Sequence, residues 1–306
     1  MPKPNLGGQA VLEGLMMQTP EKMAIAVRCR NGSIVLLKDS TIHYLSAGKF
    51  GRIPVLRGII AVMQSIFAGF RALEVSSKIF LQDAEKPDDN SSKTDLQQSE
   101  NAPLSSLTAY IATIVFLITI YMLVIFPGSF LKILSIESLS TSALFPFYES
   151  LLSLVLIILY LLAISFIPEV YRTFQYHGAE HKVINAYEQN VDLSLDAIRQ
   201  CSRFHPRCGT LFLFYSFIIG MLGFSFLPKD GPIWFHVLAR IFSLPLILGF
   251  SFEFLAYLDK KSGRFAKFLV APGLVIQNLT TREPEDTHLE VGLHALLALL
   301  EDSTFQ

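Results

Sequence analysis

Four long apolar segments constrain the fold of this chain more than any other feature. They cover residues 107–127, 147–168, 210–227 and 233–258, and a helix needs roughly 20 apolar residues to cross the hydrocarbon core of a bilayer. With 51% hydrophobic and only 17% charged residues, the whole chain also departs from the composition of a soluble globular protein. The sequence therefore predicts a mainly α-helical, polytopic membrane protein with about four spans.

Basic residues are distributed unevenly between the loops. They cluster before the first span, between the second and third, and after the fourth, whereas the other two loops contain only Lys132 and Lys229. By the positive-inside rule, both termini and the loop 169–209 lie in the cytoplasm, and the protein is a multi-pass protein of the cell membrane. The net charge of −1 gives no reason to expect nucleic acid as a partner. Membrane lipids are the expected partners, because the predicted spans lie among them.

The first 52 residues are expected to form a small sheet before the membrane part. Apolar and polar residues alternate from Met23 to Cys29, and Asn31-Gly32 then supplies a two-residue hairpin turn before the apolar residues 34–37. The glycine-rich stretch 7–14 argues against a helix and favours tight turns or a close approach of the backbone, with contact to a ligand as the alternative.

Residues 53–82 predict an interfacial or packed helix, because the charge-free run 58–70 is shorter than a span. A tilted span is the alternative. Residues 83–106 are acidic and polar and predict a flexible linker.

Within the fourth apolar segment, His236, Arg240 and Glu253 are unusual, because charges inside a membrane usually face the bundle interior and form pairs. For Arg240, snorkelling at the end of a span is the alternative. After the last span, segment 259–306 is expected to turn at Pro272-Gly273 and to end in an amphipathic helix. That helix packs on the cytoplasmic portion or, alternatively, lies on the membrane surface.

The loop 169–209 holds the densest group of chemically active side chains. His177 and His181 are four residues apart, so on a helix both imidazoles lie on one side and can bind one metal ion. Glu180 completes a His-x-x-Glu-His motif, the inverted form of the zincin motif, in which the carboxylate can act as general base. The pattern indicates metal-assisted hydrolysis without naming a substrate.

A second group, His205 and Cys208, ends the same loop and can point at the centre that His177 and His181 define. These donors suit a divalent metal, zinc above all: four direct ligands make a closed structural site, whereas three leave a position for chemistry. We expect the three histidines to be ligands, Cys208 to be the fourth ligand or a neighbour, and Glu180 to be the general base. The alternative is that the histidines only form hydrogen bonds at a helix end near anionic lipid headgroups.

Glu188 is a further carboxylate on the same predicted helix. It lies about 16 Å from His177 along an unbroken helix, too far to share one metal. It can instead orient a ligand or contact a substrate, and Asn185 and Tyr187 have the same alternatives.

These motifs resemble those of YqhQ-like bacterial membrane proteins, the domain-of-unknown-function 1385 family. The shared stretches are His-Gly-Ala-Glu-His-Lys with Asn185, Tyr187 and Glu188, then His-Pro-Arg-Cys-Gly-Thr, Thr-Thr-Arg-Glu-Pro and, near the start, Gly-Gly-Gln-Ala-Val-Leu-Glu-Gly-Leu-Met-Met. The likeness extends from Gly7 to about Leu297. It implies a metal-dependent enzyme of the bacterial inner membrane and supplies no substrate.

Together these features predict helical spans at 107–168 and 210–258, joined to a small cytoplasmic α+β portion with a zinc-type site at the membrane. The predicted function is a metal-dependent hydrolase with a lipid, lipid-linked or membrane-peptide substrate. The competing hypothesis is non-enzymatic: a metal-stapled scaffold for membrane assembly, or a carrier whose path Arg240 and Glu253 mark.

The charge distribution predicts that the loop carrying His177 and Cys208 faces the cytoplasm. A membrane-impermeant thiol-reactive reagent applied to intact cells should therefore not label Cys201 or Cys208. Labelling of either cysteine only from outside would reverse the topology.

Overall fold

The computed structural model describes residues 6–40, 53–85, 145–224, 226, 233–261 and 263–301. The expected span at 107–127 and residues 86–106 of the expected linker lie outside this part. The described part is mainly helical with four strands near its start, which confirms the predicted fold class. It divides into two compact units, described separately: Met1–Glu85, Tyr160–Gly220 and Ile241–Gln306 form the first, and Lys86–Leu159 and Met221–Arg240 the second.

An antiparallel four-stranded sheet opens the first unit. The strands are β1 (Gly7–Val11), β2 (Gly14–Gln18), β3 (Lys22–Arg28) and β4 (Ile34–Ser40), paired in sequence order. The expected hairpin is confirmed as β3–β4. The glycine-rich stretch forms a second hairpin, β1–β2, which the sequence analysis did not predict.

The β3–β4 turn differs from the expected one. The Gly32 N–H donates to the Cys29 carbonyl at 2.9 Å, so Arg30 and Asn31 are the central residues of the turn. Among the residues of this turn, only Gly32 has a positive φ, +85°. This places Gly32 where a longer hairpin loop needs a left-handed residue, a conformation that costs glycine little.

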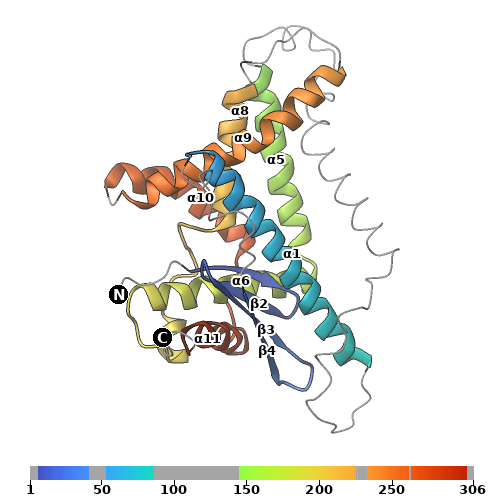
Figure 1. Cartoon of the computed structure of the whole chain (residues 1–306), viewed down its shortest axis with the longest axis vertical. Helices are drawn as coiled ribbons and strands as arrows, with labels where there is room; N and C mark the ends of the chain where they lie inside the picture. Colours follow the sequence, from blue (N-terminus) through green and yellow to red (C-terminus); the bar gives the residue numbers. More distant parts are fainter. Residues whose placement is uncertain are drawn as a thin grey trace. The chain divides into compact units, whose positions relative to one another are not determined.

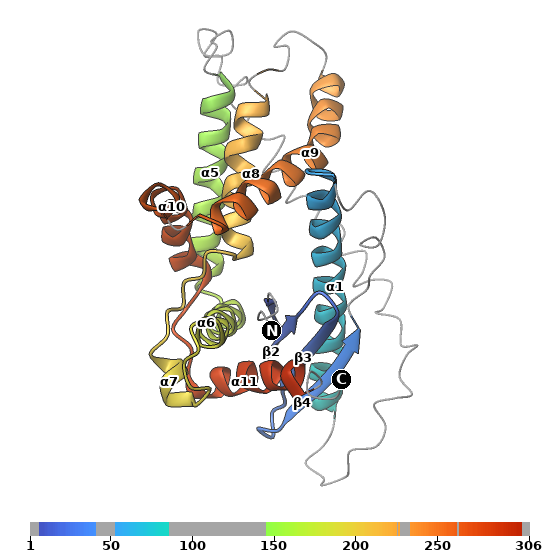
Figure 2. The same ribbon diagram turned by 60° about the vertical axis from the view of Figure 1, so that its left-hand side comes forward.

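Both faces of the sheet are covered, as Figures 1 and 2 show. Alternate side chains such as Leu15, Met17 and Ala24 pack against α6 (Pro168–Glu188) and α11 (Asp286–Glu301). Their neighbours, such as Met16 and Ile25, pack against α1 (Leu56–Glu85). The period of two along each strand therefore sends successive side chains to two separate cores.

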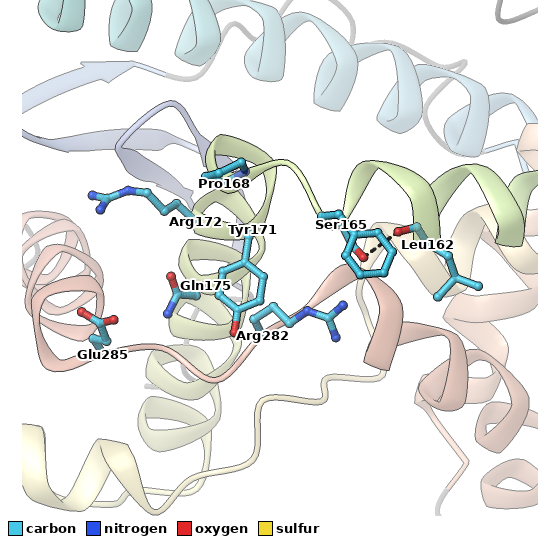
Figure 3. A pocket seen from close by; sticks show the side chains of 9 residues that line it. Leu162, Ser165, Pro168, Tyr171, Arg172, Gln175, Arg282 and Glu285 are labelled. Carbon is cyan, nitrogen blue, oxygen red and sulfur yellow. Dashed lines mark hydrogen bonds between the residues drawn. The ribbon is translucent and has the colours of Figure 1, made fainter.

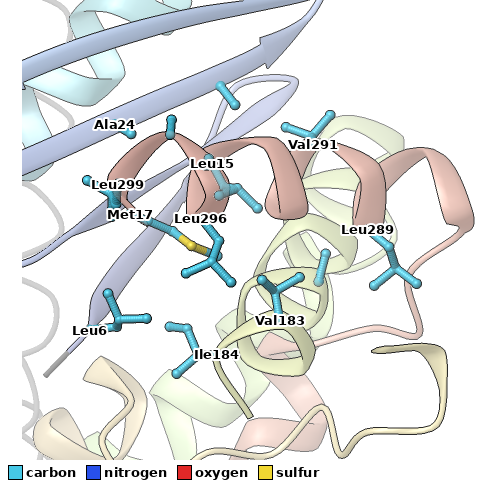
Figure 4. Packing of buried hydrophobic residues seen from close by; sticks show 14 of the residues in the cluster. Leu6, Leu15, Met17, Ala24, Val183, Ile184, Leu289, Val291, Leu296 and Leu299 are labelled. Carbon is cyan, nitrogen blue, oxygen red and sulfur yellow. The ribbon is translucent and has the colours of Figure 1, made fainter. Parts of the chain in front are cut away.

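Helix α11 is the expected amphipathic terminal helix. Leu289 and Leu296 are fully buried against α6 and the sheet. Figure 4 shows Leu296 and Leu299 facing the strand residues Leu15 and Met17, with Val183 of α6 beside them. The predicted packing of α11 on the α+β portion is thus confirmed.

Helix α1 packs against the sheet and against α9 at separate places along its length. Its second half places Ala72, Val75 and Ile79 on the sheet. Its first half crosses α9 (Ile233–Asp259) so closely that a Cβ at Gly58 would lie 2.8 Å from the Gly249 carbonyl oxygen. The segment predicted as an interfacial or packed helix is thus a helix that packs on the sheet, and it is also long and apolar enough for the alternative of a span.

Three helices among the described residues are long and apolar enough to cross a membrane. They are Leu56–Asp83 in α1, Phe147–Ile164 in α5 (Phe145–Ile164) and Leu238–Asp259 in α9. The apolar segment expected at 210–227 forms α8 (Gly209–Phe224), a shorter helix of 16 residues. The segments expected at 147–168 and 233–258 are therefore helices of spanning length, consistent with a membrane protein.

Charged groups in these apolar helices are paired. Within the first unit, Arg57 of α1 donates to both carboxylate oxygens of Glu253 at 2.6 Å. Within the second unit, Arg240 donates to Glu149 at 2.6 Å. The expectation that Arg240 and Glu253 find partners is confirmed, since an unpaired charge in hydrocarbon is costly.

The predicted turn at Pro272-Gly273 is wrong, because α10 (Arg264–Thr280) continues through both residues. Proline removes one hydrogen bond of the helix, but tertiary contacts hold the remainder in place. Gly273 packs so closely on α8 that a Cβ there would lie 1.8 Å from Leu211 Cδ1. Gln277 exchanges two hydrogen bonds with the backbone of His205, at 2.8 and 3.0 Å.

The β2–β3 pairing predicts a strong effect of Gly14→Ala. The new Cβ would lie 2.2 Å from the Ala26 carbonyl oxygen, so the two strands must move apart. We expect a loss of about 1–3 kcal/mol in unfolding free energy, measured as a lower Tm in detergent. Gly7→Ala in the same hairpin is the matched control, because its Cβ would meet neighbours at an ordinary 3.7 Å and should leave Tm nearly unchanged. Equal Tm values for the two variants would contradict this account of the sheet.

Candidate metal site

The site is built on α6, whose middle is buried in the first unit. From Gln175 to Ala186 every residue except His177 is buried, although several of these side chains are polar. Pro168 starts the helix at a position where a missing N–H costs nothing. Because buried polar groups require partners, the surrounding segments must supply them.

His177 is held in one orientation by α10. Its Nδ1 lies 2.8 Å from the Thr280 carbonyl oxygen at the end of that helix. A carbonyl only accepts, so Nδ1 carries the proton and Nε2 presents a lone pair. That Nε2 lies 3.2 Å from Cys208 Sγ.

His181 repeats this arrangement one turn later. Its Nδ1 donates to the Arg203 carbonyl at 2.6 Å, and its ring lies 4.5 Å from the His177 ring, centroid to centroid. Burial, partly offset by Cys208, lowers the pKa of His181 and favours the neutral imidazole. A neutral imidazole whose other nitrogen donates to a carbonyl is the usual state of a metal-binding histidine.

Cys208 completes a cluster of three donors. It is buried directly before α8, and its Sγ and the ring nitrogens of His177 and His181 all lie within 4.8 Å of one another. Ligands of a tetrahedral zinc ion lie about 3.3–3.8 Å apart, given metal–ligand distances of about 2.0–2.3 Å. The spacing and the chemistry of this donor set therefore fit a zinc-type ion.

His205, the third histidine expected as a ligand, points elsewhere. Its ring lies 5.8 Å from that of His181, but its Nε2 is 3.3 Å from a carboxylate oxygen of Glu188. Glu188 also accepts from Arg207. Although burial raises the pKa of Glu188, the hydrogen bonds and charges of His205 and Arg207 lower it overall. Cys208, not His205, thus joins the two histidines of α6.

Glu180 is buried beside the cluster. Burial raises the pKa of its carboxyl, against the opposing effects of His177 and His205. Strand β1 lies directly on this side chain: a Cβ at Gly8 would come within 2.7 Å of the Glu180 carboxyl. The close backbone approach predicted for the glycine-rich stretch is confirmed here, and it identifies Gly8 as a residue of the site.

Sequence reasoning missed the groups that orient the histidines. The carbonyls of Arg203 and Thr280 carry no side-chain signal, so no pattern could reveal them. Asn185, which the sequence left open, donates to the Ser202 and Phe204 carbonyls at 2.8 and 3.1 Å. It therefore fastens the loop before Cys208 to α6.

A comparison with known families decides the affiliation of the chain. The family described as "Protein of unknown function (DUF1385)" matches residues 53–302. The chain belongs to this family. Among curated relatives, the "Uncharacterized protein YqhQ" of Bacillus subtilis (strain 168) is 36% identical over 299 residues, which cover 97% of this chain and 92% of the relative. No solved structure matches the chain. The predicted family is confirmed, and neither description assigns an activity.

The three-donor cluster predicts which variants lose metal. Zinc in the purified protein should fall from about one ion per chain toward zero in the His177→Ala/His181→Ala double variant and strongly in Cys208→Ala. His205→Ala is the matched control within the same turn and should keep most of its zinc, because His205 contacts Glu188. Unchanged zinc in the double variant would remove the metal hypothesis. If His205→Ala lost its zinc while Cys208→Ala kept it, His205 rather than Cys208 would be the third ligand.

Proposed function

We propose that the protein is a metal-dependent, zinc-type membrane enzyme that hydrolyses its substrate at the cytosolic face of the membrane. The observation that supports this function best is the convergence of His177, His181 and Cys208. A buried carboxylate, Glu180, lies on α6 between the two histidines in sequence. Two imidazole nitrogens and one cysteine sulfur suit zinc better than magnesium or calcium, which prefer oxygen ligands.

Three protein ligands are the number found in catalytic zinc sites, whereas structural sites use four. When bound, zinc supplies Lewis-acid polarisation of a carbonyl or phosphoryl group and activates water for attack. The structure pairs His205 with Glu188, which supports a three-ligand rather than a four-ligand set. A three-ligand set is what the enzyme hypothesis requires.

Glu180 is the residue we assign to proton transfer. Glu188 is not available for this role, because its two carboxylate oxygens are hydrogen-bonded to His205 and Arg207. A general base must lie within hydrogen-bond reach of the proton it removes, and Glu180 is adjacent in sequence to His181 and one turn from His177. Lys182 faces a different group, the Arg199 carbonyl, at 2.6 Å.

The substrate class follows from the position of α6 in the chain. Only residues 165–167 separate α6 from the spanning-length helix α5, so the site lies close to the membrane. A lipid, a lipid-linked molecule or a membrane peptide is therefore the proposed substrate, with membrane lipids as partners. We propose the cytoplasmic side for this site, because the basic loops favour that orientation under the positive-inside rule.

A scaffold is the second candidate function. A metal held by His177, His181 and Cys208 would fasten α6 to the start of α8, which is what a structural staple does. The carrier variant of this idea has less support, because Arg240 and Glu253 are each paired with a partner. The scaffold and the enzyme differ in whether they need Glu180.

Glu180→Gln separates the two functions. A scaffold needs its ligands but no base, whereas loss of a general base typically lowers a rate by about 10²- to 10⁴-fold. We expect Glu180→Gln to keep its zinc and its Tm but to fail in complementing a strain that lacks the protein. Glu169→Gln, an exposed change on the first turn of the same helix, is the matched control and should complement fully.

Zinc content must be measured on the same preparations, because glutamine can also disturb the neighbouring histidines. If Glu180→Gln keeps its zinc and complements fully, the enzyme hypothesis fails and the scaffold replaces it.

A further inference from the structure

A groove opens in the first unit where α5 ends and α6 begins. It has a volume of about 670 Å³, within the range of small-molecule sites. Figure 3 shows its lining: Leu162 and Ser165 at the end of α5, Tyr171 of α6, and Arg282 from the segment that follows α10. None of these side chains belongs to the His–His–Cys cluster.

Arg282 is one of the charged residues that line this groove. It is the arginine of the Thr-Thr-Arg-Glu-Pro motif, and its backbone N–H donates to the Phe174 carbonyl at 2.9 Å, which fixes its position beside α6. One guanidinium nitrogen donates to the Asn278 carbonyl at 2.9 Å, and the group lies 5.7 Å from the Tyr171 ring. Its Nε is buried without a hydrogen-bond partner. Within the described ranges, its partners are thus a carbonyl and a ring rather than a carboxylate.

The other charges that line the groove do not neutralise Arg282. Arg172 is engaged by Glu13, to which its Nε donates at 2.8 Å. In Figure 3, Glu285 lies at the opposite end of the groove from Arg282 and Ser165. An anion at the Arg282 end would therefore meet a positive charge and no nearby carboxylate of the lining.

The wall of the same end is apolar and exposed. Phe166 is 85% exposed and Leu162 38% exposed, and both line the groove. The membrane-spanning window of α5 ends at Ile164, so this wall belongs to the last turn of the span and the residues just after it. Arginine and tyrosine at the end of a span are positioned at the level of lipid headgroups.

We propose that this groove binds the phosphate of an anionic phospholipid, with Arg282 as its ligand and with Leu162 and Phe166 against the adjoining hydrocarbon. A guanidinium forms strong paired hydrogen bonds with phosphate oxygens. A lipid is favoured over free phosphate because the apolar wall at the end of α5 gains contacts only from a ligand with a hydrocarbon portion. This inference does not depend on the metal cluster or on catalysis.

The test uses the full chain, delipidated in a neutral detergent, with phosphatidylglycerol as the probe. At about ten times its Kd, this lipid should raise Tm by about 3–5 °C, and phosphatidylcholine should give a much smaller rise. In Arg282→Gln the affinity for phosphatidylglycerol, followed as the lipid-bound fraction in native mass spectrometry, should fall about ten-fold or more. Arg264→Gln, the same charge change on the exposed start of α10, is the matched control and should keep both effects.

Two further arms separate the lipid from free phosphate and from a folding defect. Inorganic phosphate should not raise Tm at concentrations where the lipid does, and Phe166→Ser should weaken lipid binding while leaving the apo Tm unchanged, because the Phe166 side chain is largely exposed. Equal Arg282-dependent binding of inorganic phosphate would overturn the lipid assignment. Binding of phosphatidylglycerol that Arg282→Gln and Phe166→Ser leave intact would overturn the site.

Discussion

The burial of a polar helix is the constraint on which the rest of this structure depends. Helix α6 carries His181, Lys182 and Asn185 into the interior of the first unit. Each buried polar group would cost free energy without a hydrogen bond. Backbone carbonyls of the segment from Arg199 to Phe204 accept hydrogen bonds from all three side chains, and Lys182 also pairs with Glu283. The path of that loop is therefore tied to α6.

The same hydrogen bonds prepare the candidate metal site. The carbonyls of Arg203 and Thr280 accept hydrogen bonds from the Nδ1 atoms of the two histidines, which leaves both Nε2 atoms facing Cys208. Metal-binding histidines are commonly oriented in this way. The site is therefore shaped by the loop before α8 and by the end of α10, although both histidines of the cluster come from α6. His205, which lies in that loop, is turned to Glu188.

Helix α6 also connects the α+β portion with α5, a helix of spanning length. One side of it packs on the sheet and on α11, where Gly8 and Gly292 allow close approach. Its first turns meet the end of α5 at the groove that contains Arg282. The segment from Thr280 to Arg282 takes part in both places, since it accepts from His177 through one carbonyl and donates to Phe174 through one N–H. A metal and a lipid would thus be held on neighbouring parts of one helix, within one compact unit.

Periodicity and composition alone determined much of this protein. Two of the four apolar segments are helices of spanning length as predicted, alternation predicted the β3–β4 hairpin, and leucine spacing predicted α11. Each of these patterns is local and follows from where a side chain points along a helix or a strand. Four-residue spacing also brought His177 and His181 together, since one helical turn does so wherever the helix lies.

Other features were decided only by tertiary structure. Helix α10 continues through Pro272 because Gly273 and Gln277 are held by α8 and His205. Cys208 rather than His205 completes the cluster, because His205 is hydrogen-bonded to Glu188 and Gln277, which lie elsewhere in the chain. Contacts between distant residues leave no periodic trace in a sequence, so only the folded chain could show which three donors lie together.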